Sequence, residues 1–242
     1  MNTLVIDAGN TRFKLAIFKK NEIVWQDAMT VLTITGLEKV IAEWNPEATL
    51  VSSVIHMEAA LVDFIRLLPN NIFLNEKTAV PITNKYETPQ TLGRDRLANV
   101  VAASSIYPHA DLLVIDAGTC LKFDIIDKDK NYYGGAISPG LKMRFESLHH
   151  FTEMLPLLTH VESAPLTGVS TETSIQSGVQ NGMLAEINGI CDEYRKHYAN
   201  LELILTGGDW RYFLNHLKKP IFADPELTLK GLHLILLHNY RP

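Results

Sequence analysis

The pentapeptide VIDAG occurs twice in this chain, at residues 5–9 and again at 114–118. Each copy ends an apolar stretch with Asp-Ala-Gly, and a second apolar stretch follows after a short turn, giving VIDAGNTRFKLAIF and VIDAGTCLKFDII. An apolar strand that reverses into a second strand is a recognisable structural unit. Because this unit recurs near the middle of the chain, the sequence predicts an internal duplication.

Apolar spacing in the first half predicts three strands joined by short turns, followed by alternating helices and strands. Segment 75–92 carries two prolines and many polar side chains, so it is predicted to be a loop. The predicted strands are 2–7, 13–18, 22–28, 49–55 and 72–74, and the predicted helices are 36–44, 57–68 and 94–106.

The same order begins again in the second half, and no Gly/Ser-rich or Pro-rich linker separates the halves. We therefore expect an α/β fold of two related lobes, 1–110 and 111–242, each a mixed sheet flanked by helices. The lobes are expected to pack closely, with a cleft between them. The second half has predicted strands at 111–117, 121–127, 131–137 and 201–206, and helices at 140–150, 174–198, 208–217 and 226–239.

Charge and hydropathy exclude several classes of protein. The net charge is −5, from 22 Lys+Arg against 27 Asp+Glu, which gives no electrostatic basis for binding nucleic acid or an anionic membrane. The longest apolar candidate, LHLILLHNY, is shorter than the ~18–20 residues that a membrane helix needs. Asp7 interrupts the region where an export signal would be apolar. We expect a soluble, cytoplasmic protein whose two cysteines, Cys120 and Cys191, are reduced.

The two DAG turns suggest a phosphate site. An apolar strand that ends in Asp-Ala-Gly presents a carboxylate at the edge of its sheet, and Gly9 permits a tight reversal that exposes backbone N–H groups. A carboxylate beside a phosphate requires a cation between them, a role that Mg²⁺ fills in nucleotide enzymes. One such turn is equally typical of an ordinary hairpin. Two copies in duplicated halves favour a site that holds a triphosphate from both sides.

Other catalytic motifs are absent from the sequence. It contains no G-x-x-x-x-G-K-[ST], no G-x-G-x-x-G after a strand, no H-E-x-x-H and no G-x-S-x-G. The nine histidines are scattered, and the pair His149-His150 is expected on the solvated face of a helix. These absences leave the DAG turns as the strongest functional signal.

Several motifs together resemble a known family. With both DAG turns in duplicated lobes, the sequence resembles the superfamily of sugar kinases, actin and Hsp70, with ribonuclease H-like lobes. Within that superfamily it is similar to the type III pantothenate kinases. The motifs are DAGNTRFK at 7–14, Tyr86 followed by GRDR at 93–96, DAGTCLKFD at 116–124, GGAISPGL at 134–141, T-x-x-S-x-x-x-G from Thr171, and TGGD at 206–209.

The resemblance implies ATP-dependent phosphorylation of pantothenate to 4'-phosphopantothenate, the first step of coenzyme A synthesis. It assigns the general base to Asp95, Mg²⁺ bound with ATP to Asp7, and a monovalent cation, K⁺ or NH₄⁺, to Asp116. The implied ATP-binding residues are Asp7, Ala8, Gly9, Asn10, Thr11, Arg12, Phe13, Lys14, Thr119, Gly207 and Gly208. The implied pantothenate-binding residues are Tyr86, Gly93, Arg94, Asp95, Arg96 and Thr171.

Most of these residues also have an ordinary structural interpretation. Asp95 could cap the helix that begins at 94, and Lys14 could be an exposed strand lysine. Arg96 could contact the pantothenate carboxylate or a phosphate, or could simply be a surface arginine. Apart from the resemblance, Tyr86 is a loop aromatic and Thr171 a helix N-cap. Gly207 and Gly208 fit a tight turn beside the adenosine or a plain helix start.

Lys122 departs from the pattern expected after the second DAG turn, where a small hydroxyl residue would be typical. An ammonium group there would occupy space near the monovalent cation, which predicts a weakened or absent potassium dependence. The alternative is that Lys122 points to solvent from its strand.

Two other functions stay open, namely another small-molecule kinase of the superfamily, or a non-catalytic nucleotide-binding regulatory protein. Tyr86 with GRDR argues against the first, and joint retention of Asp7, Asp95 and Asp116 argues against the second. The resemblance also implies a homodimer whose active site the partner completes. Gly178 and Gly182 thin one face of the predicted helix 174–198, which suits a close helix–helix approach.

Overall fold

The computed structural model describes residues 1–217 and 220–240, which form two compact units. Unit 1 contains Met1–Ile106 together with the residues from Glu226 onward, and unit 2 contains Tyr107–Pro225. The chain therefore enters unit 2 close to the expected boundary at 110. The division differs from expectation at the C-terminus, because the helix expected at 226–239 belongs to the first unit.

Unit 1 is built on a five-stranded sheet in the order β3-β2-β1-β4-β5. The first three strands form the antiparallel meander that the sequence predicts, and β4 and β5 then add in parallel to β1. The strands are β1 (Asn2–Ala8), β2 (Phe13–Lys19), β3 (Glu22–Met29), β4 (Ala48–Ser53) and β5 (Asn71–Phe73).

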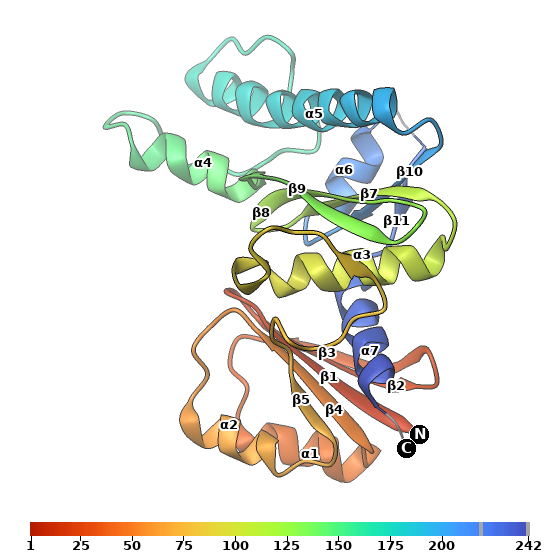
Figure 1. Ribbon diagram of the computed structural model, residues 1–242. Helices are drawn as coiled ribbons and strands as arrows, with labels where there is room; N and C mark the ends of the chain where they lie inside the picture. The colour runs from red at the N-terminus through yellow and green to blue at the C-terminus, as the bar shows by residue number, and fades with distance from the viewer. Residues whose placement is uncertain (218–219, 241–242) are drawn as a thin grey trace. The chain divides into compact units, whose positions relative to one another are not determined.

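Helices cover both faces of this sheet (Figure 1). Successive strand residues point to opposite faces, so Leu4 and Ile6 pack with helices α1 (Ile34–Trp44) and α2 (Ala59–Arg66). Val5 points the other way, into a second apolar cluster with helices α3 (Arg94–Ile106) and α7 (Leu227–Asn239). The predicted helices of this half are confirmed within a few residues at each end.

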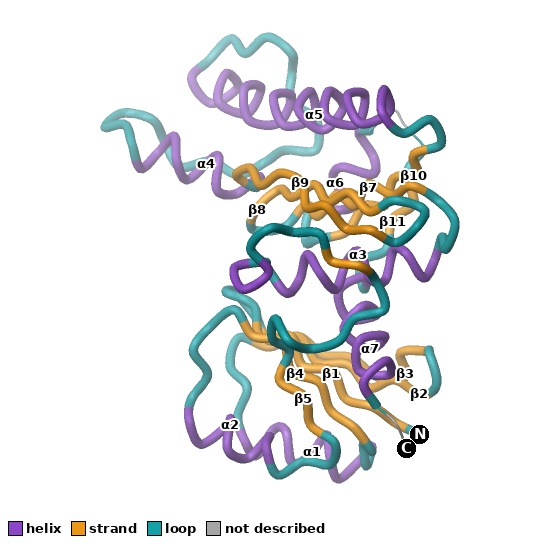
Figure 2. Tube along the Cα trace, in the orientation of Figure 1, coloured by secondary structure: helices purple, strands orange, loops and turns teal. Residues whose placement is uncertain are grey.

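α7 is apolar nearly all round, and it packs against α3 and the sheet of unit 1 (Figure 2). A methyl group at Gly231 would lie 1.8 Å from the backbone oxygen of Ala98, so only glycine permits this approach of the two helices. Nearby, the ring of His233 stacks on Phe18 with 4.1 Å between ring centroids, and its Nδ1 lies 3.0 Å from the Thr3 hydroxyl. These contacts bind the C-terminal helix to the first unit.

Segment 75–92 is largely irregular, as predicted. It contains a two-residue strand β6 (Thr83–Asn84) and a short 3₁₀ helix η1 (Pro89–Thr91), neither of which the sequence pattern predicted. Both are too short to show a period in the sequence. The segment leads directly into α3.

Unit 2 repeats the strand meander, and its strands run in the order β11-β10-β7-β8-β9. α4, α5 and α6 all pack on one face of the sheet, through alternate residues such as Leu113 and Ile115. The predicted strands and helices of this half are confirmed, and only β11 was missed. The elements are β7 (Asp111–Ala117), β8 (Cys120–Ile126), β9 (Asn131–Pro139), β10 (Leu201–Thr206), β11 (Phe222–Ala223), α4 (Leu141–His150), α5 (Thr171–His197) and α6 (Trp210–His216).

Candidate functional site

The first DAG turn closes the β1–β2 hairpin. Its backbone hydrogen bond joins Gly9 N–H to the carbonyl of Arg12 at 3.1 Å, and residues 10–12 are exposed. Asp7 and Lys14 are register partners across the hairpin. Since partners in an antiparallel pair point to the same face, a carboxylate and an ammonium group stand side by side next to an exposed turn.

A side chain on β4 also lies beside Asp7. Ser52 is the register partner of Asp7 on its other side, and its hydroxyl is fully buried with no hydrogen-bond partner. The alternation along β1 places Asp7 on the face covered by α3 and α7. A buried hydroxyl without a partner costs free energy, so this corner has unsatisfied hydrogen-bonding capacity.

The first turn of α3 lies at the same edge of the sheet. The guanidinium group of Arg94 donates to the backbone oxygen of Ser53, and Ser53 is the register partner of Ala8 in the first DAG turn. This hydrogen bond fixes the start of α3 against the carboxyl end of β1. It brings the GRDR motif and the DAGNTRFK motif together within unit 1, although almost eighty residues separate them in the sequence.

Asp95 lies in the first turn of α3, where its Oδ1 accepts a hydrogen bond from the Arg96 backbone N–H at 2.9 Å. A carboxylate in this position interacts favourably with the helix dipole, but Asp95 is the second residue of α3, so the interpretation of Asp95 as the N-cap is wrong. A methyl group at Gly93 would lie 2.7 Å from this Oδ1, so a larger residue there would displace the Asp95 carboxylate. The geometry is compatible with a catalytic role at the helix start.

Arg96 is 4% exposed, so it is not the surface arginine of the alternative interpretation. Its guanidinium group lies over the Tyr86 ring, 5.5 Å from the centroid, which is the geometry of a cation–π contact. Asn84 positions the tyrosine by accepting a hydrogen bond from the Tyr86 N–H at 3.0 Å. Tyr86 and the GRDR motif therefore form one structural group.

The second DAG turn carries a buried ion pair. Lys122 Nζ lies 2.8 Å from Asp116 Oδ2, and the two side chains are 14% and 10% exposed. The residues are register partners on β7 and β8, as Asp7 and Lys14 are in the first hairpin. The interpretation of Lys122 as a solvent-facing strand lysine is therefore wrong.

Glycines pack closely around this second turn. Gly207 has a φ of +95°, and a methyl group there would lie 2.4 Å from the Ala117 carbonyl and 2.5 Å from Asp116 Oδ1. A methyl group at Gly140 would lie 2.3 Å from the Gly118 oxygen. The plain helix-start interpretation of Gly207 is insufficient, because the position demands both positive φ and close approach.

Asp209 completes the TGGD motif. Its backbone N–H donates to the Ala117 oxygen at 2.9 Å, which attaches the start of α6 to the end of β7. Burial raises the pKa of the Asp209 carboxyl, and the charge of His160 partly offsets this effect. Thr119, in contrast, is exposed at the tip of the turn.

Thr171 lies in different surroundings, in an open hollow of about 680 Å³ between α4 and α5 that Arg144 and Ser174 also line. It is the first residue of α5, whereas Ser170 is the N-cap, so the interpretation of Thr171 as the cap is wrong. Ser170 and Thr173 form a capping box, which explains why α5 begins earlier than the predicted residue 174.

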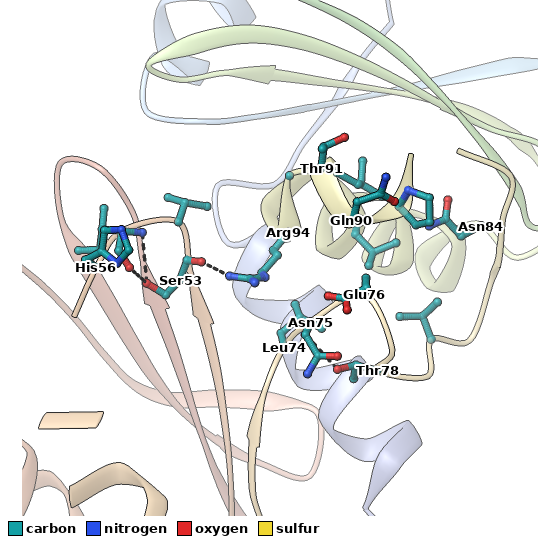
Figure 3. Close-up of a pocket in the computed structure, with 17 residues that line it drawn as sticks. Ser53, His56, Leu74, Asn75, Glu76, Thr78, Asn84, Gln90, Thr91 and Arg94 are labelled. Carbon is teal, nitrogen blue, oxygen red and sulfur yellow. Dashed lines mark hydrogen bonds between the residues drawn. The ribbon is translucent and has the colours of Figure 1, made fainter. Parts of the chain in front are cut away.

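A cavity of about 450 Å³ adjoins the start of α3 within unit 1 (Figure 3). Its wall is formed by the residues after β4, the residues after β5, and the approach to α3 that ends in Gly93 and Arg94. Glu76 and Gln90 also line it, and no motif in the sequence pointed to either. Their only sequence signal is the polar character of segment 75–92.

Further findings concern groups outside this site. Both cysteines are free, and His149 and His150 are exposed, as predicted. In the described part of the chain, no helix is long and apolar enough to cross a membrane. Among the same residues, no group of three or more His, Cys, Asp or Glu side chains is arranged to hold a metal ion.

Solved structures share this architecture. A Campylobacter jejuni protein provisionally assigned to the Baf family of transcriptional activators superposes with a TM-score of 0.62 at 22% identity, covering 98% of both chains. A Sinorhizobium meliloti protein provisionally assigned as a 2-dehydro-3-deoxygalactonokinase gives 0.58 at 11% identity, covering 99% of this chain and 100% of that one. At such identities the likeness shows the fold, which is that of the actin-like class of duplicated α/β proteins.

Sequence relatives narrow this class. A type III pantothenate kinase from Phocaeicola vulgatus is 45% identical over 237 residues, which cover 98% of each chain. Relatives of the same name from Bacteroides fragilis strain YCH46 and Christiangramia forsetii are 41% and 40% identical, again over 98% of each chain. The sequence profile of type III pantothenate kinases matches residues 3–193. The chain belongs to the type III pantothenate kinase family.

Proposed function

We propose that this protein transfers the γ-phosphoryl group of ATP to the primary hydroxyl of pantothenate, giving 4'-phosphopantothenate for coenzyme A synthesis. The observation that carries this proposal is the hydrogen bond from Arg94 to Ser53, which holds Asp95 at the same sheet edge as the first DAG turn. A phosphoryl-transfer enzyme needs a phosphate site and a proton acceptor close together. Family membership supplies the identity of the two substrates.

Asp95 acts as the general base in this proposal. Its carboxylate accepts the proton of the pantothenate hydroxyl while the hydroxyl oxygen attacks the γ-phosphorus, and the bond from that phosphorus to the β–γ bridging oxygen breaks to release ADP. The positive end of α3 favours the ionised carboxylate that this step requires.

The first DAG turn binds the phosphates of ATP through exposed backbone N–H groups. Lys14 supplies a point charge beside them for the transferring group. The second turn contributes Thr119, and the turn after β10 meets the nucleotide through Gly207 and Gly208. The full proposed ATP set is Asp7, Ala8, Gly9, Asn10, Thr11, Arg12, Phe13, Lys14, Thr119, Gly207 and Gly208.

ATP-dependent kinases require a divalent metal, and the residues at the first turn fit Mg²⁺. Mg²⁺ is usually held by one or two carboxylates with substrate phosphates and water rather than by a full protein cage. Asp7 offers one carboxylate, and the unpartnered hydroxyl of Ser52 beside it can bond to a metal-bound water. When bound, the ion neutralises charge on the phosphates.

Pantothenate is recognised by Tyr86, Thr171 and the GRDR residues 93–96 in this proposal. Arg96 is buried with its guanidinium group over the Tyr86 ring, which places the two proposed pantothenate-binding residues in contact with each other. A small amide with two hydroxyls and a carboxylate needs only a few such polar groups in an otherwise apolar site.

Lys122 replaces the monovalent cation that the family resemblance assigns to Asp116. Its ammonium group is 2.8 Å from the carboxylate, which leaves no room for K⁺ between them. We expect equal activity in sodium, Tris and potassium buffers. A large stimulation by potassium would contradict this part of the proposal.

The proposed activity is tested by ADP release in a coupled assay, with pantothenate present or omitted. Asp95→Asn should lower kcat by about 10²- to 10⁴-fold, the usual contribution of a general base. Asp63→Asn, an exposed carboxylate on α2, is the matched control and should keep full activity. ADP release that does not depend on pantothenate would disprove the function, and an active Asp95→Asn variant would disprove the base.

We also propose a homodimer formed through the outer face of α5. Small residues follow this face at helical spacing, and a methyl group at any of its glycines would meet no atom within 4 Å. The segment before α5 exposes large apolar side chains, including Phe151 at 81% and Met154 at 88%, which a partner would cover. The small residues are Gly178, Gly182, Ala185 and Gly189.

Light scattering coupled to gel filtration tests the dimer. The wild type should have the mass of two chains, and Gly182→Arg should have the mass of one with an unchanged circular dichroism spectrum. A monomeric wild type, or a variant that stays dimeric, would exclude this interface.

A further inference from the structure

The loop that connects α4 to α5, residues 151–170, contains no helix or strand in the described structure. Irregular loops of this length inside a compact unit are uncommon, and ordered ones usually carry a function. Polar side chains of α5 bond to the backbone of this α4–α5 loop at several points along the first half of the helix. The path of the loop therefore depends on a few identifiable side chains.

Three of these side chains lie four residues apart along α5, so they occupy one face of the helix. Each of them bonds to the backbone of the loop. In the described part of the chain none of the three bonds to α6, so their effect is confined to α5 and the loop. They are Thr173 with the Val169 N–H at 3.0 Å, Ser177 with the Leu166 oxygen at 2.7 Å, and Asn181 with the Pro165 oxygen at 3.1 Å.

Gln180 differs from these three because it also reaches α6. Its side chain is fully buried, and its Oε1 accepts a hydrogen bond from the Val161 N–H at 3.0 Å. Its Nε2 donates to the Val161 oxygen at 2.8 Å and to the Tyr212 hydroxyl at 2.7 Å. A buried amide is costly unless its polar groups are bonded, so the position suits an amide that joins the loop to α6.

The orientation of α6 depends on contacts of this kind. The helix has only seven residues, and isolated helices of that length are marginal in water. One attachment is the hydrogen bond from the Asp209 N–H to the Ala117 oxygen at 2.9 Å. Another is the bond between Tyr212 and Gln180. Because turn 207–208 directly precedes Asp209, these two attachments fix the turn that we propose meets the nucleotide.

The α4–α5 loop itself also reaches this region through His160. The His160 ring lies 5.4 Å from the Tyr212 ring between centroids, at an interplanar angle of 63°. Burial raises the pKa of the Asp209 carboxyl, and the charge of His160 acts in the opposite direction. Val161, whose backbone Gln180 holds, directly follows His160. The same amide therefore fixes the loop where it meets the start of α6.

We propose that Gln180 is a positioning residue for nucleotide binding, which holds the α4–α5 loop at Val161 and α6 at Tyr212 and thereby fixes turn 207–208. The inference rests on the proposed function and deepens it, because it assigns part of the ATP affinity to a side chain outside the ATP-binding set. Gln180 is buried between α5, the loop and α6, so it acts only through them.

The test measures the Kd of ATP by titration calorimetry and the KM of both substrates by the coupled assay. Tyr212→Phe removes only the hydroxyl that Gln180 contacts. It should raise the Kd and KM for ATP about 3- to 10-fold, the usual contribution of one hydrogen bond, and leave kcat and the KM for pantothenate nearly unchanged. Asn181→Ala is the matched control, because it removes a bond to the same loop from the adjacent residue and should not change ATP affinity.

Gln180→Met keeps the length of the side chain and removes all its hydrogen bonds, so it should weaken ATP binding at least as much as Tyr212→Phe. If the two residues act through their shared bond, the double variant should bind ATP no more weakly than Gln180→Met alone.

Unchanged ATP affinity in Tyr212→Phe, an equal loss in Asn181→Ala, or additive losses in the double variant would overturn this inference. The proposed function would stand in each case, provided that ADP release depends on pantothenate. A wild type that binds ATP but shows no pantothenate-dependent ADP release would overturn the proposed function alone.

Discussion

Replacing Lys122 with methionine isolates the buried ion pair of the second DAG turn. Methionine keeps an unbranched side chain of similar length and removes the charge, so Asp116, whose side chain is only 10% exposed, loses the ammonium group that neutralises it. At 2.8 Å the gross attraction of the pair is about 6 kcal/mol for an effective dielectric constant of roughly 20. Breaking a buried pair by removing one partner typically costs about 3–5 kcal/mol.

We therefore expect Lys122→Met to lower the free energy of unfolding by about 3–5 kcal/mol in sodium or Tris buffer. Urea titration followed by circular dichroism measures the change. Lys142→Met is the matched control, because Lys142 forms a pair with Glu146 at 3.4 Å while 86% exposed. Exposed pairs of this kind contribute about 0.3–0.5 kcal/mol.

Potassium provides the second part of the experiment. If the ammonium group stands in a cation site, its removal should leave space and a carboxylate for K⁺ or NH₄⁺. Potassium at 100 times its Kd would then raise the free energy of unfolding of the variant by about 2.7 kcal/mol. It should leave that of the wild type unchanged. A variant within about 1 kcal/mol of the wild type, below the range for a broken buried pair, would refute the reasoning. A variant that potassium does not stabilise would refute the replacement of the cation.

Further substitutions test the packing within each of the two units. Gly207→Ala should destabilise by about 1–3 kcal/mol because of its positive φ and its contact with Ala117, whereas Gly208→Ala, with open space around it, should stay within about 0.5 kcal/mol in the same thermal or urea unfolding. Gly231→Ala should lower the free energy of unfolding by about 1–3 kcal/mol or more, since α3 and α7 must separate, and a neutral result would contradict their close contact. Burial lowers the pKa of His233 from 6.5 to about 4, so the folded state favours the neutral ring: stability is fully present above pH 6.5 and should fall by about 3 kcal/mol as pH decreases to 4. His233→Gln should flatten this pH dependence, and an unchanged slope would show that another group causes it.

The strands and most helices could be predicted from the sequence because their apolar period is clear. α5 began three residues before its predicted start because its first turn is set by the capping box of Ser170 and Thr173, two polar side chains with no apolar period. β11 has two residues, Phe222 and Ala223, and such a short pairing leaves no pattern. Periodicity therefore determines the middle of an element better than its ends.

The assignment of α7 to the first unit could not be predicted. Its sequence is apolar nearly all round, which indicates a buried helix but does not identify the surface that buries it. The information lies in two distant details, the close approach of Gly231 to Ala98 and the hydrogen bond between His233 and Thr3. Neither forms a local motif, so only the folded chain shows the connection.

The candidate site, too, could be predicted only in part from the sequence. The motifs identified Arg94, Asp95 and Arg96 together, but their sequence adjacency hides that the three side chains point to different surroundings. Glu76 and Gln90 belong to no motif and reach the cavity only through the path of segment 75–92. Identity at a motif position is readable from sequence, whereas the direction of each side chain depends on helix phase and on the loop that faces it.

The two copies of VIDAG share the same strand and hairpin, but the turns that follow them differ. Both copies end a central strand and face a lysine across the hairpin, Asp7 with Lys14 and Asp116 with Lys122. The first turn is one residue longer, its Gly9 N–H is bonded to Arg12, and its residues 10–12 are exposed. The second is packed beneath glycines and neutralised by its own ammonium group. Equal pentapeptides thus produce an exposed turn, which we propose binds phosphate, and a packed turn whose carboxylate is paired with a lysine of the same hairpin, because turn length and neighbours decide what the carboxylate contacts.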